Sequence, residues 1–503
     1  MLFRNLGANM IAGVAGPVIS ILFARFYIKK IGLDGFGAVG FFAIFSVVIQ
    51  TFTQGINVTL ERRAASKLQV PSERQSVQAF FGTLQYAYWV SAVLIFVSAV
   101  VSSGYLSEHL QGRKGLLASD AQLSICAGAA LISLNILTGF YGSLFVGIGK
   151  QVFLSSVQTC SVLMQTAISV GLVILKPVPS SFIAGQVVAT ASAALILGYK
   201  ANREVGWRES RLKPDLKYLK AETRESLALV SLEALGVIIT YIDRMMVAAF
   251  LPFASLGAYT VAQTGARGLS VLRGPMLQAF TPIILSWSDE ADSTLVRGKF
   301  WKIQGILMTM VGVLATVLIL TSKQIIVLWL NDDTLADIVA APMSLLVAGS
   351  FLLVMSGPSY LVAVSRKYTR PVLVYNIAST IVMASAGPWC AGKFGLTGAA
   401  SMWVGYCAGS LIATHAGIAR LLYPNASLDF IKDAGRIFVK SVAVVTIVCG
   451  FHFFIMHWFG SGKAGPEWAI IRIAILSLVG FAASYGILLG FSRISNLSRY
   501  VSS

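Results

Sequence analysis

The chain has little charge. Asp, Glu, Lys and Arg make up 12% of its 503 residues, whereas hydrophobic residues make up 56%. Soluble globular proteins carry about 25% charged residues, so this composition excludes a soluble domain. Apolar runs of about 20 residues, enough to cross the hydrocarbon of a bilayer, recur along the chain instead. The sequence therefore predicts an all-α polytopic membrane protein.

Cysteine and histidine are also scarce. The five cysteines stand alone at or within the apolar runs and form no CxxC pair, and the four histidines are scattered. Neither set has the spacing of a metal site. We interpret the cysteines as small packing residues and expect no metal and no cofactor.

Acidic residues are few relative to basic ones. There are 21 Asp and Glu against 39 Lys and Arg, a formal net charge of +18. The basic residues lie in short loops between apolar runs, as in the positive-inside bias of membrane proteins, so nucleic acid is not an expected partner. The sequence has no P-loop, and the longest outer loop, 102–122, has no compact carboxylate cluster. We therefore expect a transporter rather than an enzyme, with a membrane glycosyltransferase or ligase as a lesser alternative.

Hydropathy predicts about fourteen transmembrane helices. Their ranges are 5–28, 37–60, 78–103, 123–148, 152–175, 182–199, 227–250, 256–284, 300–321, 338–362, 372–390, 397–419, 438–459 and 468–490. Lys and Arg are concentrated in the loops on the side of both termini, which predicts that both termini are cytoplasmic.

The longest polar stretch lies between the sixth and seventh predicted helices. It divides the chain into two lobes of six helices and an additional pair. The expected domains are an N-terminal lobe at 1–199, a basic cytoplasmic linker at 200–226, a C-terminal lobe at 227–419, and helices thirteen and fourteen with a cytoplasmic tail at 420–503.

Charged residues occur where a bilayer disfavours them. The seventh and eighth predicted helices contain Glu233, Asp243, Arg244, Arg267 and Arg273. A charge near the bilayer centre costs about 3 kcal/mol or more, so such residues usually face a bundle interior or a wet cavity. At 100° per residue, polar side chains also gather on one side of two helices. These stripes are Gln50, Gln54, Asn57 and Glu61 in the second helix and Gln263, Arg267, Ser270 and Gln278 in the eighth.

The two striped helices belong to a short internal repeat. In the first lobe, Arg25 is followed by Gly35-Phe36-Gly37-Ala38-Val39; in the second, Arg244 is followed by Ser255-Leu256-Gly257-Ala258-Tyr259. Both copies begin on the same side of the membrane. We therefore expect two lobes related by an axis along the membrane normal.

These motifs resemble those of a known family. The residues that carry the resemblance are Asn5-Leu6-Gly7, the run RFYIKKIGLDGFG at 25–37, 55–65 with Glu61-Arg62-Arg63, Asp243-Arg244 and 256–259. The pattern is similar to that of polysaccharide-exporting flippases of the multidrug/oligosaccharidyl-lipid/polysaccharide (MOP) superfamily, in particular Wzx-type O-antigen flippases.

This resemblance implies a V-shaped MOP/MATE-like pair of six-helix bundles that alternate in access. It also implies the movement of an undecaprenyl-diphosphate-linked oligosaccharide, such as an O-antigen unit for lipopolysaccharide, across the bacterial inner membrane. A polysaccharide polymerase and other assembly proteins are then candidate partners. Relatives that flip lipid II also have fourteen helices, the last two lining a lipid-tail groove. Cation-coupled drug exporters of the superfamily typically have twelve helices and an acidic cavity. Both remain alternatives.

The arginines are the candidate substrate contacts. A guanidinium stays protonated and binds phosphate oxygens in a bidentate fashion. We expect Arg25, Arg244, Arg267 and Arg273 to form a cationic cavity, with Arg267 as the central contact. The polar side chains of both stripes would line it, and Gln50, Gln54 and Asn57 would meet sugar hydroxyls. The alternative is that these arginines snorkel or pair with a carboxylate for stability.

The acids have separate candidate roles. Glu233 could exchange a proton or cation as access alternates, because burial raises the pKa of a carboxyl; a simple satisfied hydrogen bond is the alternative. We expect Asp243 to form an ion pair with an arginine of another helix. Glu61, next to Arg62 and Arg63, is expected to pair locally.

Overall fold

The computed structural model describes most of the chain, and all structural statements below concern the described residues. These are 2–68, 70–114, 118–206, 235–289, 293–366, 368, 370–423, 427–459 and 466–494. They divide into two compact units, Met1–Thr260 and Val261–Ser503, with the boundary inside one helix. Most of the expected linker, the start of the seventh helix and Glu233 lie outside the described residues.

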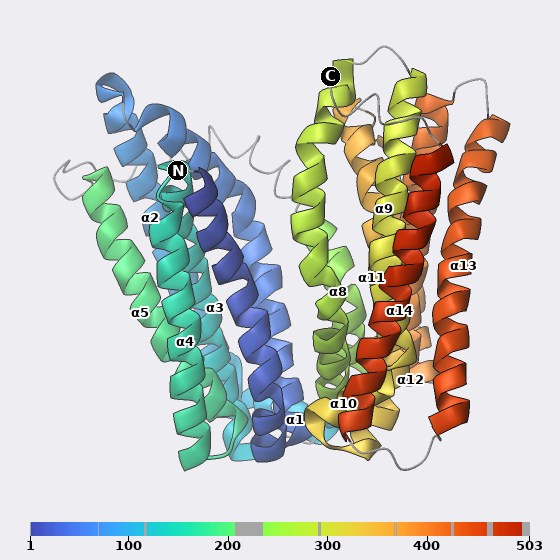
Figure 1. Cartoon of the computed structure of the whole chain (residues 1–503). Helices are drawn as coiled ribbons and strands as arrows, with labels where there is room; N and C mark the ends of the chain where they lie inside the picture. The colour runs from blue at the N-terminus through green and yellow to red at the C-terminus, as the bar shows by residue number, and fades with distance from the viewer. Residues whose placement is uncertain are drawn as a thin grey trace. The chain divides into compact units, whose positions relative to one another are not determined.

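The first unit is a bundle of long helices (Figure 1). Its elements are α1 (Leu2–Lys67), α2 (Pro71–Lys114), α3 (Ala118–Gly147), α4 (Gln151–Leu175), α5 (Pro179–Val205), a helical segment at 235–250, and the first turns of α8 (Phe253–Leu285). Pro179 opens α5 at a position where its missing N–H costs nothing, and Gly206 closes the helix in the left-handed conformation.

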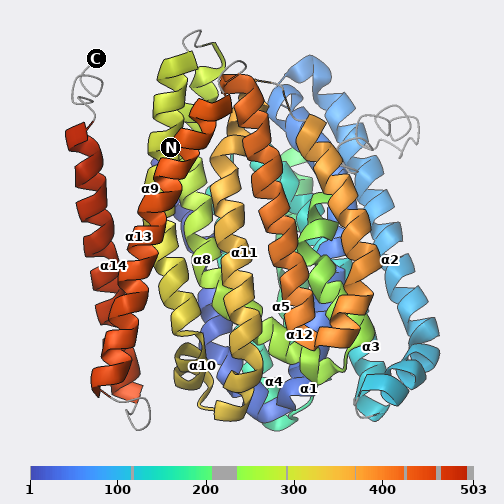
Figure 2. The same ribbon diagram turned by 90° about the vertical axis from the view of Figure 1, so that its right-hand side faces the viewer.

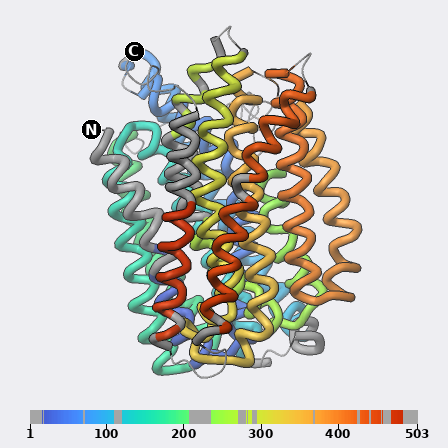
Figure 3. The backbone as a smooth tube through the Cα atoms, turned by 45° about the vertical axis from the view of Figure 1, so that its right-hand side comes forward, coloured from blue at the N-terminus to red at the C-terminus, as the bar shows by residue number. Residues whose placement is uncertain are grey.

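The second unit is also helical. It contains the rest of α8, a 3₁₀ turn at Ser286–Asp289, α9 (Ser293–Leu320), α10 (Ser322–Leu330), α11 (Asp333–Ser365), α12 (Arg370–Leu422), α13 (Ser427–Phe459) and α14 (Pro466–Ile494). The last two run side by side (Figures 2 and 3). A buried apolar cluster joins α9, α13 and α14, and includes Val313, Val444, Val448, Ile455 and Leu476.

Two helices each contain two of the predicted spans. Gly32 interrupts α1 with φ 75° and ψ 170°, and Gly395 interrupts α12 with φ 60° and ψ −138°. Residues with a Cβ rarely adopt these positive φ values, so glycine suits both turns. Figure 2 shows the two arms of α12. Nine helices in the described ranges are long and apolar enough to cross a membrane, α1 and α12 among them. The prediction of a polytopic all-α protein is confirmed.

The structure differs from the predicted boundaries in three places. The outer loop at 102–122 is largely helix, because α2 continues to Lys114. At 1.5 Å per residue, α2 is roughly 66 Å long, more than a bilayer with its headgroups, so hydropathy detects only part of it. Helix α13 begins at Ser427, eleven residues before the predicted span 438–459, so its polar start is continuous with its apolar part. The short helix α10 was not expected, since nine residues are too few for a hydropathy signal.

The division into units also differs from the expected domains. The unit boundary lies at Thr260, so 235–260 groups with the first unit rather than with the helices that follow. The physical reason is the close packing of the repeat glycines described next. The two-lobe assignment by sequence remains a prediction.

The two glycines of the sequence repeat lie back to back within the first unit. A Cβ added to Gly37 would overlap the carbonyl oxygen of Phe253 and lie 2.9 Å from the backbone nitrogen of Gly257. A Cβ added to Gly257 would overlap the carbonyl oxygen of Leu33 and lie 3.2 Å from the nitrogen of Gly37. The contact is thus reciprocal, each glycine meeting the carbonyl one helical turn before the other. Only residues without a side chain allow such an approach.

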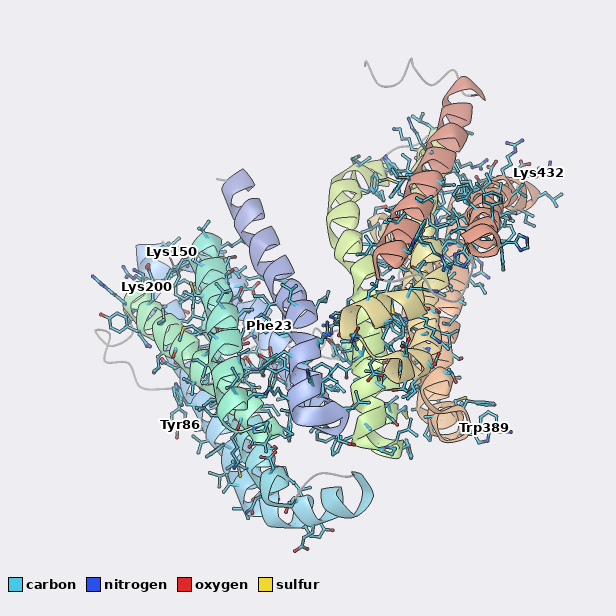
Figure 4. All side chains as sticks on the ribbon, turned by 60° about the horizontal axis from the view of Figure 1, so that its bottom comes forward. Phe23, Tyr86, Lys150, Lys200, Trp389 and Lys432 are labelled. Atoms are coloured by element: carbon cyan, nitrogen blue, oxygen red, sulfur yellow. The ribbon has the colours of Figure 1, made fainter. Side chains whose placement is uncertain are left out.

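The first unit has an aromatic core. Phe140 is fully buried, and its ring lies 5.2 Å from that of Phe81 and 4.7 Å from that of Tyr88. At one end of the bundle, the Lys150 ammonium lies 2.5 Å from a carboxylate oxygen of Glu204. Figure 4 shows Lys150 and Lys200 at this same end.

A buried carboxylate joins α3 to α5. Asp120 is 5% exposed and accepts hydrogen bonds from the Ser124 hydroxyl, at 3.2 Å, and from the backbone N–H of Ser180, at 3.2 Å. The Ser180 hydroxyl also donates to Asp120. Asp120 therefore satisfies donors at the first turn of α5, where helix N–H groups have no partner within the helix.

We predict that Asp120→Ala lowers the free energy of unfolding by about 2 kcal/mol, since buried donors lose their acceptor. Thermal unfolding of the purified protein in detergent measures this loss. The control is Ser192→Ala, which removes an exposed hydroxyl that bonds only to its own helix and should change stability by less than about 0.5 kcal/mol. Equal thermal unfolding midpoints for Asp120→Ala and Ser192→Ala would show that the Asp120 carboxylate does not stabilise the fold.

Candidate functional site

Arg244 lies in an apolar helical segment and has no acidic partner among the described residues. It lies on the helical segment 235–250, is partly buried, and places its guanidinium carbon 4.7 Å from the centre of the Tyr241 ring. The buried Nε of Arg244 has no hydrogen-bond partner in the part of the chain that the structure describes. Within the described ranges no carboxylate forms an ion pair with it. The stacking on Tyr241 is a cation–π contact that holds the guanidinium in place.

Arg25 has a related environment in the same unit. It lies on the first arm of α1, close to the Gly32 turn, and its side chain is exposed. No ion pair joins it to an acid in the described part of the chain. Its neighbours Ala24 and Tyr27 are buried, so Arg25 lies on the opposite side of the helix from the packed core. Among the described residues, neither arginine of the sequence repeat forms an ion pair.

Asp243 turns into the core of the first unit. It is 2% exposed, and one of its carboxylate oxygens accepts a 2.7 Å hydrogen bond from the hydroxyl of Tyr259, which is fully buried. Tyr259 belongs to the Gly257-Ala258-Tyr259 run of the sequence repeat. This bond therefore holds the segment that carries Arg244 against the first turns of α8. The predicted ion pair of Asp243 with an arginine of another helix remains a prediction.

We predict that Tyr259→Phe lowers the free energy of unfolding by about 2 kcal/mol, because a buried carboxylate oxygen loses a donor and the phenyl ring keeps the packing. Thermal unfolding of the detergent-solubilised protein tests this. The matched control is Tyr86→Phe, where the side chain is 61% exposed and the loss should be small. A Tyr259→Phe protein as stable as the control would contradict the assigned role.

The polar residues of α8 beyond Thr260 belong to the second unit. Gln263 is buried and Arg267 is exposed. The side chains of Ser270, Arg273 and Gln278 lie outside the described residues. The grouping of all four arginines in one cavity remains a prediction.

The stripe of the second predicted span is divided between the core and the surface. Asn57 is 4% exposed and accepts a 2.8 Å hydrogen bond from the Tyr88 hydroxyl. Gln50 donates to the Ser46 hydroxyl at 3.0 Å, whereas Gln54 is exposed. Gln54 is therefore the member of the stripe most open to a ligand, and Asn57 is engaged inside the bundle.

Glu61 does not form the expected local pair. No described side chain forms an ion pair with it. Arg63 instead places its guanidinium carbon 4.3 Å from the centre of the Phe80 ring. The backbone of Glu61 packs against Gly147, where a Cβ would lie 2.5 Å from the Glu61 carbonyl oxygen.

Sequence reasoning assigned no role to two residues that shape this site, Tyr241 and Tyr259. Tyr259 stands within the repeat motif, which was a usable signal. Tyr241 precedes Arg244 by three residues, a spacing that places side chains on the same side of a helix. In the described ranges no group of three or more His, Cys, Asp or Glu side chains gathers as a metal site would.

Comparison with solved structures identifies the fold. The chain is similar to the lipid II flippase MurJ in an inward closed conformation, with a TM-score of 0.69, 14% identity, and coverage of 98% of this chain and 99% of that one. It is also similar to an inward-facing MATE family multidrug resistance transporter of the MOP superfamily. There the TM-score is 0.64 at 14% identity, and 87% of this chain and 98% of that chain are covered.

Sequence comparison identifies the family. The chain is 23% identical over 303 residues to the uncharacterized membrane protein EpsK of Bacillus subtilis (strain 168), and the match covers 57% of each protein. A family model described as polysaccharide biosynthesis protein matches residues 2–287, more than half of the chain. The protein is therefore a multi-pass membrane protein of the polysaccharide biosynthesis protein family.

Proposed function

We propose that this protein is a flippase for an undecaprenyl-diphosphate-linked oligosaccharide, an O-antigen or similar repeat unit. The observation that carries the proposal is the state of Arg25 and Arg244, two arginines of apolar membrane helices that have no acidic partner in the described part of the chain. Keeping such charges in a bilayer is costly, so they are expected to serve a ligand. Membership of the polysaccharide biosynthesis protein family supports a ligand that carries a glycan.

The chemistry of the two arginines suits a lipid diphosphate. The diphosphate carries negative charge that must cross the low-dielectric hydrocarbon core of the membrane. A guanidinium is permanently charged and donates hydrogen bonds to phosphate oxygens from a planar group. Arg267 and Arg273 would extend the cationic path along α8, and Gln54 would meet sugar hydroxyls. Glu233 is the candidate for coupling to a proton or cation.

The proposed direction is the one that the resemblance to polysaccharide-exporting flippases implies, from the cytoplasmic to the periplasmic leaflet of a bacterial inner membrane. Both termini are predicted to be cytoplasmic. Alternating access of the two lobes would expose the cationic residues to each side in turn. A polysaccharide polymerase would then consume the flipped product.

A second candidate function is lipid II transport. The similarity to the lipid II flippase MurJ extends over 98% of this chain, whereas the MATE transporter match covers 87%. The shared requirement is again a lipid diphosphate. A drug exporter of the superfamily is less favoured, because the uncompensated charges described here are cationic.

The test is deletion of the gene in its own host. We expect the lipid-linked glycan to accumulate on the cytoplasmic leaflet and the surface polysaccharide to disappear. A plasmid copy of this chain should reverse both changes. Rescue of a MurJ-depleted strain instead would favour the lipid II alternative. If neither glycan accumulates and polysaccharide is unchanged, the proposal fails.

A further inference from the structure

Two basic side chains meet on α13 and α14, away from the arginines discussed above. A terminal nitrogen of Arg472 lies 2.8 Å from Nε2 and 3.1 Å from Nδ1 of His452. His452 is 8% exposed, and Arg472 is partly exposed. No carboxylate in the described part of the second unit pairs with either residue. Two basic groups in contact without an acid are an unusual arrangement for a membrane helix pair.

The pair caps the apolar core that joins these helices. His452 lies one turn from Val448 and from Ile455 on α13, and Arg472 lies one turn from Leu476 on α14. All three apolar residues are buried in the cluster with α9. The basic pair is therefore fixed in position by packing rather than carried on a free loop.

The depth of the pair suits a lipid headgroup. Arg472 lies six residues after Pro466, the first residue of α14, which is roughly 9 Å along the helix axis. The whole of α14 is roughly 43 Å long, close to the thickness of a bilayer with its headgroups. The guanidinium thus lies near the boundary between headgroups and hydrocarbon, within snorkelling reach of lipid phosphates.

The electrostatics suit an anionic phosphate. A ring nitrogen that accepts from a guanidinium must carry a lone pair, so His452 is neutral in this contact and Arg472 supplies the only positive charge. The other ring nitrogen is then an N–H donor. The Nε of Arg472 is buried and has no hydrogen-bond partner among the described residues, whereas the side chain as a whole is partly exposed. A guanidinium in this position can donate N–H groups to the oxygens of a phosphate.

We propose that His452 and Arg472 form a binding site for the phosphate group of a membrane lipid, which fixes α13 and α14 to the membrane interface. The lipid is either a resident anionic phospholipid or the phosphorylated polyprenyl carrier, since both present the same phosphate chemistry at this depth. This site goes beyond the proposed transport path and does not depend on it.

The test is lipid binding to the purified full chain, measured by native mass spectrometry. The probes are dioleoyl phosphatidylglycerol, undecaprenyl phosphate and dioleoylglycerol, the last of which lacks a phosphate. We expect Arg472→Gln to reduce retention of the phosphorylated probe about tenfold, and Arg472→Lys to keep most of it. The matched control is Lys393→Gln, which removes an exposed cation of the same unit that stacks on Trp389. It should change retention by less than about twofold.

The outcomes are distinct. The site is supported if the wild type retains phosphatidylglycerol or undecaprenyl phosphate better than dioleoylglycerol and Arg472→Gln does not. The phosphorylated lipid that is retained better identifies the ligand. Equal retention of dioleoylglycerol, or equal losses in Arg472→Gln and Lys393→Gln, overturns it. If Arg472→Gln is not recovered folded, the same three probes are compared on the wild type. A phosphorylated lipid that raises the unfolding midpoint no more than dioleoylglycerol would then overturn the site.

Discussion

Export of the lipid-linked glycan should fall at least tenfold when Arg244 is replaced by alanine. The guanidinium of Arg244 stacks on Tyr241 and has no acid in the described part of the chain to neutralise it. A charge-assisted hydrogen bond to phosphate contributes about 1.5–3 kcal/mol, which corresponds to roughly ten- to hundredfold in binding. The measurement is surface polysaccharide in the deletion strain complemented with each variant, normalised to the amount of protein in the membrane.

Three variants make this result interpretable. Arg25→Ala should show a similar loss, because Arg25 occupies the corresponding place in the repeat. Arg244→Lys keeps the charge but loses the planar fork, so it should retain an intermediate activity. Arg420→Ala removes an exposed arginine near the end of α12 and should export normally. Wild-type export by both Arg25→Ala and Arg244→Ala would mean that these side chains only snorkel.

Gly257→Val should abolish both folding yield and export. Its Cβ would overlap the carbonyl oxygen of Leu33, and a backbone oxygen cannot move unless the helices separate. Overpacking a tight contact costs about 1–3 kcal/mol even where side chains can adjust, and here the obstacle is backbone. Size-exclusion chromatography and thermal unfolding measure the loss. Gly37→Val should behave in the same way, because the contact is reciprocal.

The control for this prediction is Gly171→Val on α4. Gly171 is exposed, and a Cβ added there meets no atom within 4 Å. The same change of residue type should therefore leave yield and export near those of the wild type. If Gly257→Val folds and exports as well as Gly171→Val, the close approach of α1 and α8 is not required.

Much of the fold could be predicted from the sequence. Wherever the structure describes them, the predicted spans lie within helices, apart from Ile148 and Thr321, which fall one residue beyond α3 and α9. The reason is that twenty apolar residues have few alternatives to a membrane helix. The Gly-Ala repeat also marked an important contact: Gly37 and Gly257 pack against each other. The repeat did not predict that Gly37 contacts Gly257, because a repeated motif shows that two segments are similar and not that they touch.

The site was less accessible from sequence. A helical stripe places Asn57 beside Gln54, yet Tyr88 of another helix engages Asn57, and no spacing along the chain predicts that partner. The hydrogen bond from the Tyr259 hydroxyl to Asp243 was likewise not predictable from spacing, and the expected ion pair of Asp243 with an arginine remains a prediction. Arg472 lies inside the predicted span 468–490, and only the packing of α13 against α14 brings it to His452. Helical periodicity predicts directions, whereas partners depend on tertiary packing.

The central proposal is that the guanidinium groups of Arg25 and Arg244, which form no ion pair among the described residues, bind a lipid diphosphate as it crosses the membrane. Its most direct test is a reconstituted assay in which purified protein in liposomes moves an undecaprenyl-diphosphate-linked oligosaccharide, detected by access of an impermeant lectin. The wild type should expose the glycan on both faces, and the Arg25→Gln/Arg244→Gln double variant should be at least tenfold slower at equal protein content. A double variant that moves the glycan at the wild-type rate would contradict the account.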